Sequence, residues 1–212
     1  MARARRDLTR EQVLSAALRL AERDGVTSLT MRKVAKEVGV EAMSLYNHVA
    51  DKEAMLDGLA DAVLAMFELP DPTGDWVADV RAVAHAFRRF AVQYPQTAPL
   101  ILTRQSYSPA LLRVADTVLG VLIRAGFAPA TAVHGMRALL ASVVGVLLRE
   151  MGASPTLAGD DPVSRERRVD RVVASELPNL ALVAADLSVI DHEAEFDFTL
   201  DLALESLQRI LE

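Results

Sequence analysis

The chain has 212 residues, of which 51% are hydrophobic, so it exceeds a typical small domain and can bury a large core. It contains no cysteine, which excludes a disulfide framework and thiolate chemistry, and it shows neither an N-terminal signal segment nor a run of roughly 18 apolar residues. The net charge of −6 argues against a uniformly nucleic-acid-binding surface, but residues 1–52 carry +3 and residues 53–212 carry −9.

A basic arm precedes the first expected helix. Its cations are Arg3, Arg5 and Arg6. This arm is either a segment that contacts DNA or a frayed terminus. The helix begins at Thr9, which fits a capping box with Gln12, and it ends at Asp24–Gly25.

Two short helices joined by a glycine follow. Thr30 is a suitable N-cap for a helix over residues 31–38, and Gly39 ends that helix because glycine tolerates a positive φ. A second helix restarts near residue 41 and buries Leu45 and Val49, which lie four residues apart. Its exposed face carries small, hydroxyl, amide and ring groups that can meet base edges and phosphates in a major groove: Ala42, Met43, Ser44, Tyr46, Asn47 and His48.

The next helix is predicted over residues 51–67. Asp51 caps it and places Lys52 at the helix start, where a lysine can bind a phosphate beside the exposed backbone N–H groups. A cluster of breakers from Pro70 to Gly74 ends this connection. We therefore expect a DNA-binding head over residues 1–52, a connecting helix over residues 53–70 and a body over residues 71–212.

The two-helix unit resembles the DNA-binding segment of the TetR family of bacterial transcriptional regulators. The matching positions are Thr30, Arg32, Val34, Ala35, Gly39, Val40, Ser44, Leu45, Tyr46, His48, Val49, Lys52 and Met55. The resemblance implies that double-stranded DNA is bound by the exposed face described above together with Thr30, Arg32 and Lys52. The alternative is an ordinary helical hairpin in a core.

The rest of the chain keeps a helical period, and no strand alternation competes with it, so we expect an all-α fold. The predicted helices span residues 75–94, 98–105, 109–125, 129–151, 164–176 and 194–211. A mobile loop is expected over residues 152–164. This part resembles the tetracycline-repressor-like C-terminal domain at residues 75–76, 86–88 and 125–127 and in the closing residues 196–202. That domain binds ligands and mediates dimerisation.

Two of the predicted body helices are apolar on more than one face. We expect them to form a homodimer interface through Val133, Leu140, Val144, Leu147, Leu200, Leu204 and Leu207. The resemblance implies a four-helix bundle between the two copies, and the alternative is burial within a monomer. A two-fold dimer would place its recognition helices on a near-palindrome with half-sites roughly 34–36 Å or more apart.

The resemblance also implies a pocket for a small-molecule inducer in the body. The candidate lining is mostly apolar with a few polar groups: Phe87, Phe90, Tyr94, Leu102, Arg104, Gln105, Tyr107, His134 and Arg137. The alternative for each is plain core packing. Tetracycline-binding members hold a magnesium-chelated drug with a histidine, and the corresponding position falls at or near Ile101, which cannot ligate a metal.

No catalytic constellation is found in the sequence. The four histidines are His48, His85, His134 and His192. None has the paired spacing of a zinc site, and we interpret Asp191–His192–Glu193 as a helix start rather than a metal cluster. We therefore expect no enzyme activity, no cofactor and no membrane partner. The sequence predicts a cytoplasmic regulator; repression is the expected mode of action, and activation is an open alternative. The alternative is a helical ligand- or protein-binding module without DNA-binding activity.

Overall fold

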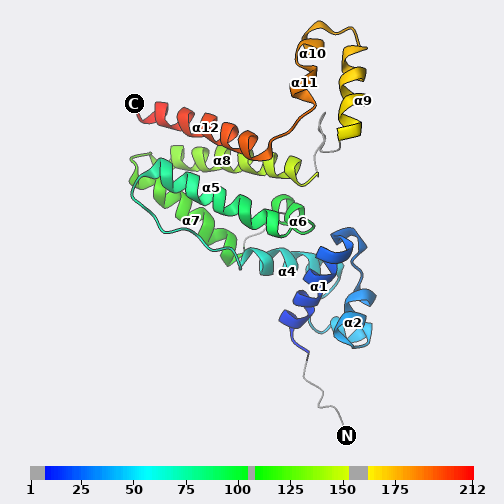
Figure 1. Ribbon diagram of the computed structural model, residues 1–212. Helices are drawn as coiled ribbons and strands as arrows, with labels where there is room; N and C mark the ends of the chain where they lie inside the picture. Colours follow the sequence, from blue (N-terminus) through cyan, green and yellow to red (C-terminus); the bar gives the residue numbers. More distant parts are fainter. Residues whose placement is uncertain (1–7, 105–107, 153–161) are drawn as a thin grey trace. The chain divides into compact units, whose positions relative to one another are not determined.

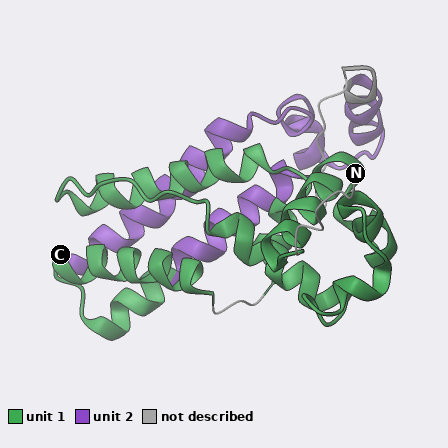
Figure 2. Cartoon of the chain, turned by 90° about the horizontal axis from the view of Figure 1, so that it is seen from below, with its two compact units in different colours: residues 1–136 green, residues 137–212 purple. Residues whose placement is uncertain are grey.

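The computed structural model describes residues 8–104, 108–152 and 162–212 (Figure 1). Within these ranges the regular elements are all helical, which confirms the predicted all-α fold. The chain divides into two compact units, Met1–Met136 and Arg137–Glu212 (Figure 2). The division of the sequence into head, connecting helix and body remains a prediction.

The first unit begins with a helix that has the predicted cap. Helix α1 spans Arg10–Asp24, and Thr9 and Gln12 exchange the two hydrogen bonds of a capping box. A 3₁₀ turn, η1 (Val26–Ser28), leads to α2 (Met31–Val38), α3 (Ala42–Leu45) and α4 (Lys52–Leu64). These elements bury one continuous apolar core. Its fully buried members include Val13, Leu29, Val34, Leu45, Met55 and Leu59. Each such side chain contributes about 1.5–3 kcal/mol through removal of apolar surface from water.

The loop after α4 is held by a buried carboxylate. Helix α5 spans Trp76–Gln93, and its Asp79 accepts hydrogen bonds from the Thr73 amide at 2.6 Å, the Thr73 hydroxyl at 2.7 Å and the Gly74 amide at 3.2 Å. These bonds lower the pKa of Asp79, because they stabilise its charged form. The breaker segment is therefore fixed to the first turn of α5.

Three further helices continue the chain: α6 (Ala98–Thr103), α7 (Pro109–Arg124) and α8 (Pro129–Glu150). Helix α5 packs against α7, and α4 packs against both α6 and α7. Among the described residues α8 is the one helix long and apolar enough to cross a membrane by length and composition, although no such run was expected from the sequence. Core helices of soluble proteins meet the same criterion.

The second unit contains the end of α8 and four helices: α9 (Pro162–Val173), α10 (Pro178–Leu182), α11 (Ala184–Leu187) and α12 (His192–Leu211). The helices α10 and α11 were not predicted, because Pro178 was interpreted only as a breaker. Proline is tolerated in the first turn of a helix, where its missing N–H has no partner to lose. Asp191 caps α12 by accepting from the amides of Glu193 and Ala194, as its interpretation as a helix start requires. The loop expected over residues 152–164 lies largely outside the described residues.

Candidate DNA-binding site and surrounding surfaces

The α2–α3 unit has the local geometry that its sequence predicts. The Thr30 hydroxyl accepts a hydrogen bond from the Lys33 amide at 3.2 Å and so caps α2. Gly39 ends the helix with φ 76° and ψ 33°, in the left-handed region. A side chain at this position would meet nothing within 4 Å, so the glycine is required by backbone conformation and not by space. The turn brings α3 back across α2.

Helix α3 directs two side chains inward and several outward. Leu45 and Val49 are buried, as predicted. Met43 is 76% exposed and Tyr46 is 48% exposed, so both stand on the outer face. Asn47 is exposed, while Ala42, Ser44 and His48 are half-buried. The regular helix is a single turn, and residues 46–48 continue it as a hydrogen-bonded turn.

Cations surround this outer face. Arg32 is exposed on α2, as are Lys33 and Lys36, which the sequence analysis did not list as site residues. The net positive charge of residues 1–52 was the feature of the sequence that could have pointed to these two lysines. Lys52 is half-buried at the first position of α4, and Asp51 caps that helix by accepting from the Ala54 amide at 2.8 Å. Such an arrangement of basic side chains and a short, solvent-facing helix suits phosphate and base-edge contacts. The arginines of the N-terminal arm lie outside the described residues.

Three predicted ligand-contact residues lie in one aromatic cluster in the first unit. Phe90 packs against Tyr94 with ring centroids 5.3 Å apart and lies 6.5 Å from Phe87. Phe67, at the end of the α4 segment, joins them at 5.5 Å from Phe87 and 5.4 Å from Phe90. Sequence analysis missed Phe67 as a site residue, although it lies one turn beyond Val63 on the apolar stripe of that segment.

The other predicted ligand-contact residues differ in their surroundings. The Arg104 guanidinium binds two carboxylates of α4, Glu53 and Asp57, so its charge is already engaged. Leu102 is half-buried, and His134 and Arg137 are exposed on α8. Gln105 and Tyr107 lie outside the described residues. Their contact with a ligand therefore remains a prediction.

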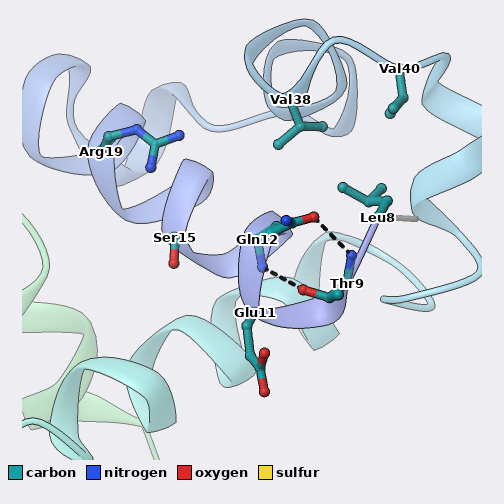
Figure 3. Close-up of a pocket in the computed structure, with 8 residues that line it drawn as sticks. All are labelled: Leu8, Thr9, Glu11, Gln12, Ser15, Arg19, Val38 and Val40. Carbon is teal, nitrogen blue, oxygen red and sulfur yellow. Dashed lines mark hydrogen bonds between the residues drawn. The ribbon is translucent and has the colours of Figure 1, made fainter. Parts of the chain in front are cut away.

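An open groove of about 580 Å³ lies on the head between the start of α1 and the α2–α3 turn (Figure 3). Its lining consists of Leu8, Thr9, Glu11, Gln12, Ser15, Arg19, Val38 and Val40. The polar groups of Thr9 and Gln12 bind each other in the capping box, as the dashed lines in Figure 3 show. None of the predicted ligand-contact residues lines this groove.

On α12 the apolar row that we expected at the dimer interface is buried within the chain, and the other apolar row is exposed. Leu200, Leu204 and Leu207 are buried within the chain, as is Leu147 of α8, so these four side chains are core residues and are not available to a second copy. The outer row of α12 consists instead of Phe198, Leu202 and Ile210, which are 67%, 52% and 59% exposed. The correction has a simple cause: a helix that is apolar on two faces carries no local signal for which face is the inner one.

On α8 the predicted interface row is only partly outward. Leu140 is 51% exposed, and Val133 and Val144 are half-buried. The second row, Leu139, Val143 and Val146, is buried. Helices α8 and α12 run alongside each other (Figure 1), and Arg149 pairs with Glu195 across them at 3.0 Å. Both helices therefore leave apolar side chains on their outer faces.

The fold and the α2–α3 geometry define an all-helical transcriptional regulator with a helix-turn-helix head. The comparisons with known proteins identify its family. Residues 13–59 match the bacterial regulatory proteins of the tetR family, and residues 69–211 match the tetracyclin repressor-like C-terminal domain. The chain belongs to the TetR family, whose members are transcriptional regulators that bind DNA and respond to ligands, and are not enzymes.

Three similar proteins illustrate this membership. An HTH-type transcriptional regulator of Saccharopolyspora erythraea is 36% identical over 144 residues, or 68% of this chain and 61% of that protein. The class A tetracycline repressor of transposon 1721 from Escherichia coli is 33% identical over 178 residues, or 82% of this chain and 79% of that protein. Among solved structures, ActR of Streptomyces coelicolor in complex with actinorhodin superposes with a TM-score of 0.82 at 25% identity, covering 95% of this chain and 97% of ActR.

Proposed function

We propose that the protein is a homodimeric, cytoplasmic repressor that binds a near-palindromic operator and is released from it by a small-molecule inducer. The observation that carries this proposal is the exposed face of α3. Leu45 anchors the opposite face of this helix in the core, and the cations of α2 flank the exposed face. A similar protein is named a repressor, and this name supports repression over activation.

Each predicted DNA-contact residue of the head has a role in this proposal. Ala42, Met43 and Asn47 contact bases, and the apolar Met43 suits a thymine methyl group. The hydrogen-bonding and charged groups bind phosphates and the adjoining base edges: Thr30, Arg32, Ser44, Tyr46, His48 and Lys52. Lys33 and Lys36 add positive charge beside them on α2.

The homodimer is proposed through the outer faces of α8 and α12. Phe198, Leu202 and Ile210 of α12 and Leu140 of α8 are each more than half exposed in the single chain. Large exposed apolar side chains in a row on one helix mark an association surface. Pairing these helices with those of a second copy would form a four-helix bundle and would link two heads for two half-sites.

The inducer is proposed to bind beside the aromatic cluster of Phe67, Phe87, Phe90 and Tyr94. Aromatic rings prefer offset or edge-to-face partners, so the cluster favours a ligand with a flat ring system. One similar structure holds actinorhodin. The position at which tetracycline-binding members have a histidine falls at or near Ile101, which cannot ligate a metal, so a magnesium–tetracycline complex is not the ligand that we propose.

The direct test is a mobility-shift titration of the purified protein against the DNA upstream of its own gene, with salt varied. We expect saturable binding at one palindrome, with an affinity that falls steeply as salt rises because phosphate contacts release counterions. The matched control is the same DNA with one half-site scrambled. A folded dimer that binds neither this DNA nor any genomic fragment in a selection experiment would refute the proposal.

A further inference from the structure

The residue that follows α6 as its C-cap makes polar contacts with α4. Arg104, the C-cap of α6, donates from Nε to an Asp57 carboxylate oxygen at 2.6 Å and from a terminal nitrogen to a Glu53 carboxylate oxygen at 2.9 Å. The same nitrogen lies 3.5 Å from the Glu53 carbonyl oxygen. Hydrogen bonds to Glu53 and Asp57 raise the pKa of Arg104, and an arginine guanidinium is charged at every physiological pH in any case.

The two carboxylates need such a partner. Glu53 and Asp57 are four residues apart on α4 and therefore lie on one face of the helix, where like charges repel. Their side chains are 70% and 60% exposed, whereas that of Arg104 is 23% exposed. Arg104 thus reaches out from a largely covered position and neutralises part of an acidic patch on the solvent side of α4.

The position of this patch gives it a consequence for DNA binding. Glu53 follows Lys52 directly, and Lys52 is the residue that we propose to bind phosphate at the start of α4. Two uncompensated carboxylates within two turns of Lys52 would lie near or within one Debye length of the phosphate backbone, about 8–10 Å at physiological salt, and would repel it.

We infer that Arg104 is a positioning residue for operator binding, which shields the phosphate backbone from Glu53 and Asp57 and so raises the affinity of the head for DNA. This inference rests on the proposed function. Because Arg104 is the C-cap of α6 and its carboxylate partners belong to α4, the shield exists only while the end of α6 keeps its place against α4. A movement of α6 would therefore change the net charge beside the DNA-binding face as well as the geometry of the head.

The test compares operator affinities at low salt. Arg104→Gln removes the shield and keeps a polar side chain of similar reach, and we expect a three- to tenfold weaker affinity, of the order that rim charges cause. The triple variant R104Q/E53Q/D57N has no shield and no carboxylates, and we expect its affinity to return to that of the wild type or exceed it. The weakening by Arg104→Gln should shrink as salt is raised.

Two control variants identify the cause of any change. Arg149→Gln removes a guanidinium from another arginine–carboxylate pair, that with Glu195 between α8 and α12. Once light scattering shows that this variant is dimeric, its operator affinity should lie within about twofold of the wild type, since the pair is outside the head. Tyr46→Phe removes a proposed phosphate contact and should weaken binding by itself. Thermal unfolding and light scattering confirm that every variant is folded and dimeric before its affinity is compared.

The outcomes separate the shield from the proposed function. If Arg104→Gln binds like the wild type while Tyr46→Phe binds weakly, the shield is wrong and the regulator assignment stands. If Arg104→Gln binds weakly and the triple variant does not recover, Arg104 acts as a mechanical tether, and the shield is likewise wrong. If the wild-type protein binds no operator, the proposed function fails and the shield fails with it.

Discussion

The outer faces of α3 and α12 both expose large side chains, yet their surroundings differ. On α3, Met43 and Tyr46 stand among hydroxyl, amide and imidazole groups, with Arg32 and two lysines on the neighbouring helix. On α12, Phe198 and Leu202 stand on a helix whose charged residues are almost all acidic. The α3 face can bind a polyanion through its polar and basic groups. The α12 face can gain free energy only when its apolar side chains are covered.

This difference shows that exposure alone does not define a binding surface. A single exposed apolar residue needs no explanation, but the residues around it decide what can cover it. The acidic charge near the α12 row would repel DNA and leaves an apolar protein surface as the suitable cover. The basic charge near α3 attracts a polyanion such as DNA. We therefore assign DNA to α3 and a second chain to α12, and the following substitutions test that assignment.

The largest effect is expected from a charge on the outer face of α12. Leu202→Glu should convert the dimer into a folded monomer, because an unpaired carboxylate at an apolar interface is costly to desolvate. Operator affinity should fall by roughly 100- to 10,000-fold, since the two heads would no longer be linked. Light scattering and the mobility-shift titration measure the two quantities.

The control for Leu202→Glu is Leu112→Glu on α7, where the leucine is exposed to a similar degree, 54% against 52%. This variant should remain dimeric and should bind the operator like the wild type. A dimeric Leu202→Glu protein, or a monomeric Leu112→Glu protein, would move the interface away from α12.

A substitution in the inner, buried row of α12 should lower the stability of the protein and leave the dimer intact. Leu204→Ala removes a side chain that is 1% exposed, and we expect the free energy of unfolding to fall by about 2–5 kcal/mol, because a buried cavity remains. The protein should still be dimeric at temperatures below its melting transition. Denaturant unfolding of Leu204→Ala and of the exposed Leu112→Ala, for which a loss within about 0.5 kcal/mol is expected, gives the comparison. Equal losses would mean that Leu204 is no more buried than the exposed Leu112, and its place on the inner row of α12 would be wrong.

The head and α12 differ in how much of their structure could be predicted from the sequence. On the head, each feature has a local cause that can be read from neighbouring residues. Thr9 and Thr30 cap their helices, Gly39 takes a positive φ, and Leu45 is the buried residue of the short helix α3. Local signals of this kind are independent of the rest of the fold, and for that reason the helix positions of the head could be predicted.

On α12 the decisive information is not local. Its stripe of Phe196, Leu200, Leu204 and Leu207 and its stripe of Phe198, Leu202 and Ile210 are both apolar and both helical in spacing. The partner helix decides which one is buried, and helical periodicity contains no information about that partner. The contact of Arg104 with α4 was unpredictable for the same reason, because it joins residues 47 and 51 positions apart in the chain.

A smaller effect is expected at the α3 face. Tyr46→Phe removes only the hydroxyl that we propose to bind a phosphate, and operator affinity should fall by about 10- to 100-fold, the cost of one hydrogen bond to a charged group. Dimer mass and thermal stability should not change. The matched variant is Tyr94→Phe in the aromatic cluster, whose hydroxyl lies 3.9 Å from the Met66 sulfur. It should bind operator DNA like the wild type, and a loss equal to that of Tyr46→Phe would remove the reason for assigning DNA to α3.

The smallest effect is expected where the backbone, and not a side chain, sets the geometry of the α3 face. Gly39→Ala places a Cβ at φ 76°, and the free energy of unfolding should fall by about 1–2 kcal/mol although the added atom meets nothing within 4 Å. Gly120→Ala is the matched substitution inside α7, where the backbone is helical and the nearest group is the end of the flexible Arg124 side chain at 3.1 Å. Alanine is the better helix former, so this variant should be unchanged or up to about 1 kcal/mol more stable. Denaturant unfolding of both variants therefore gives shifts of opposite sign. If Gly39→Ala were as stable as Gly120→Ala, the turn that presents α3 would not depend on the left-handed conformation, and the glycine would have no structural role in the DNA-binding unit.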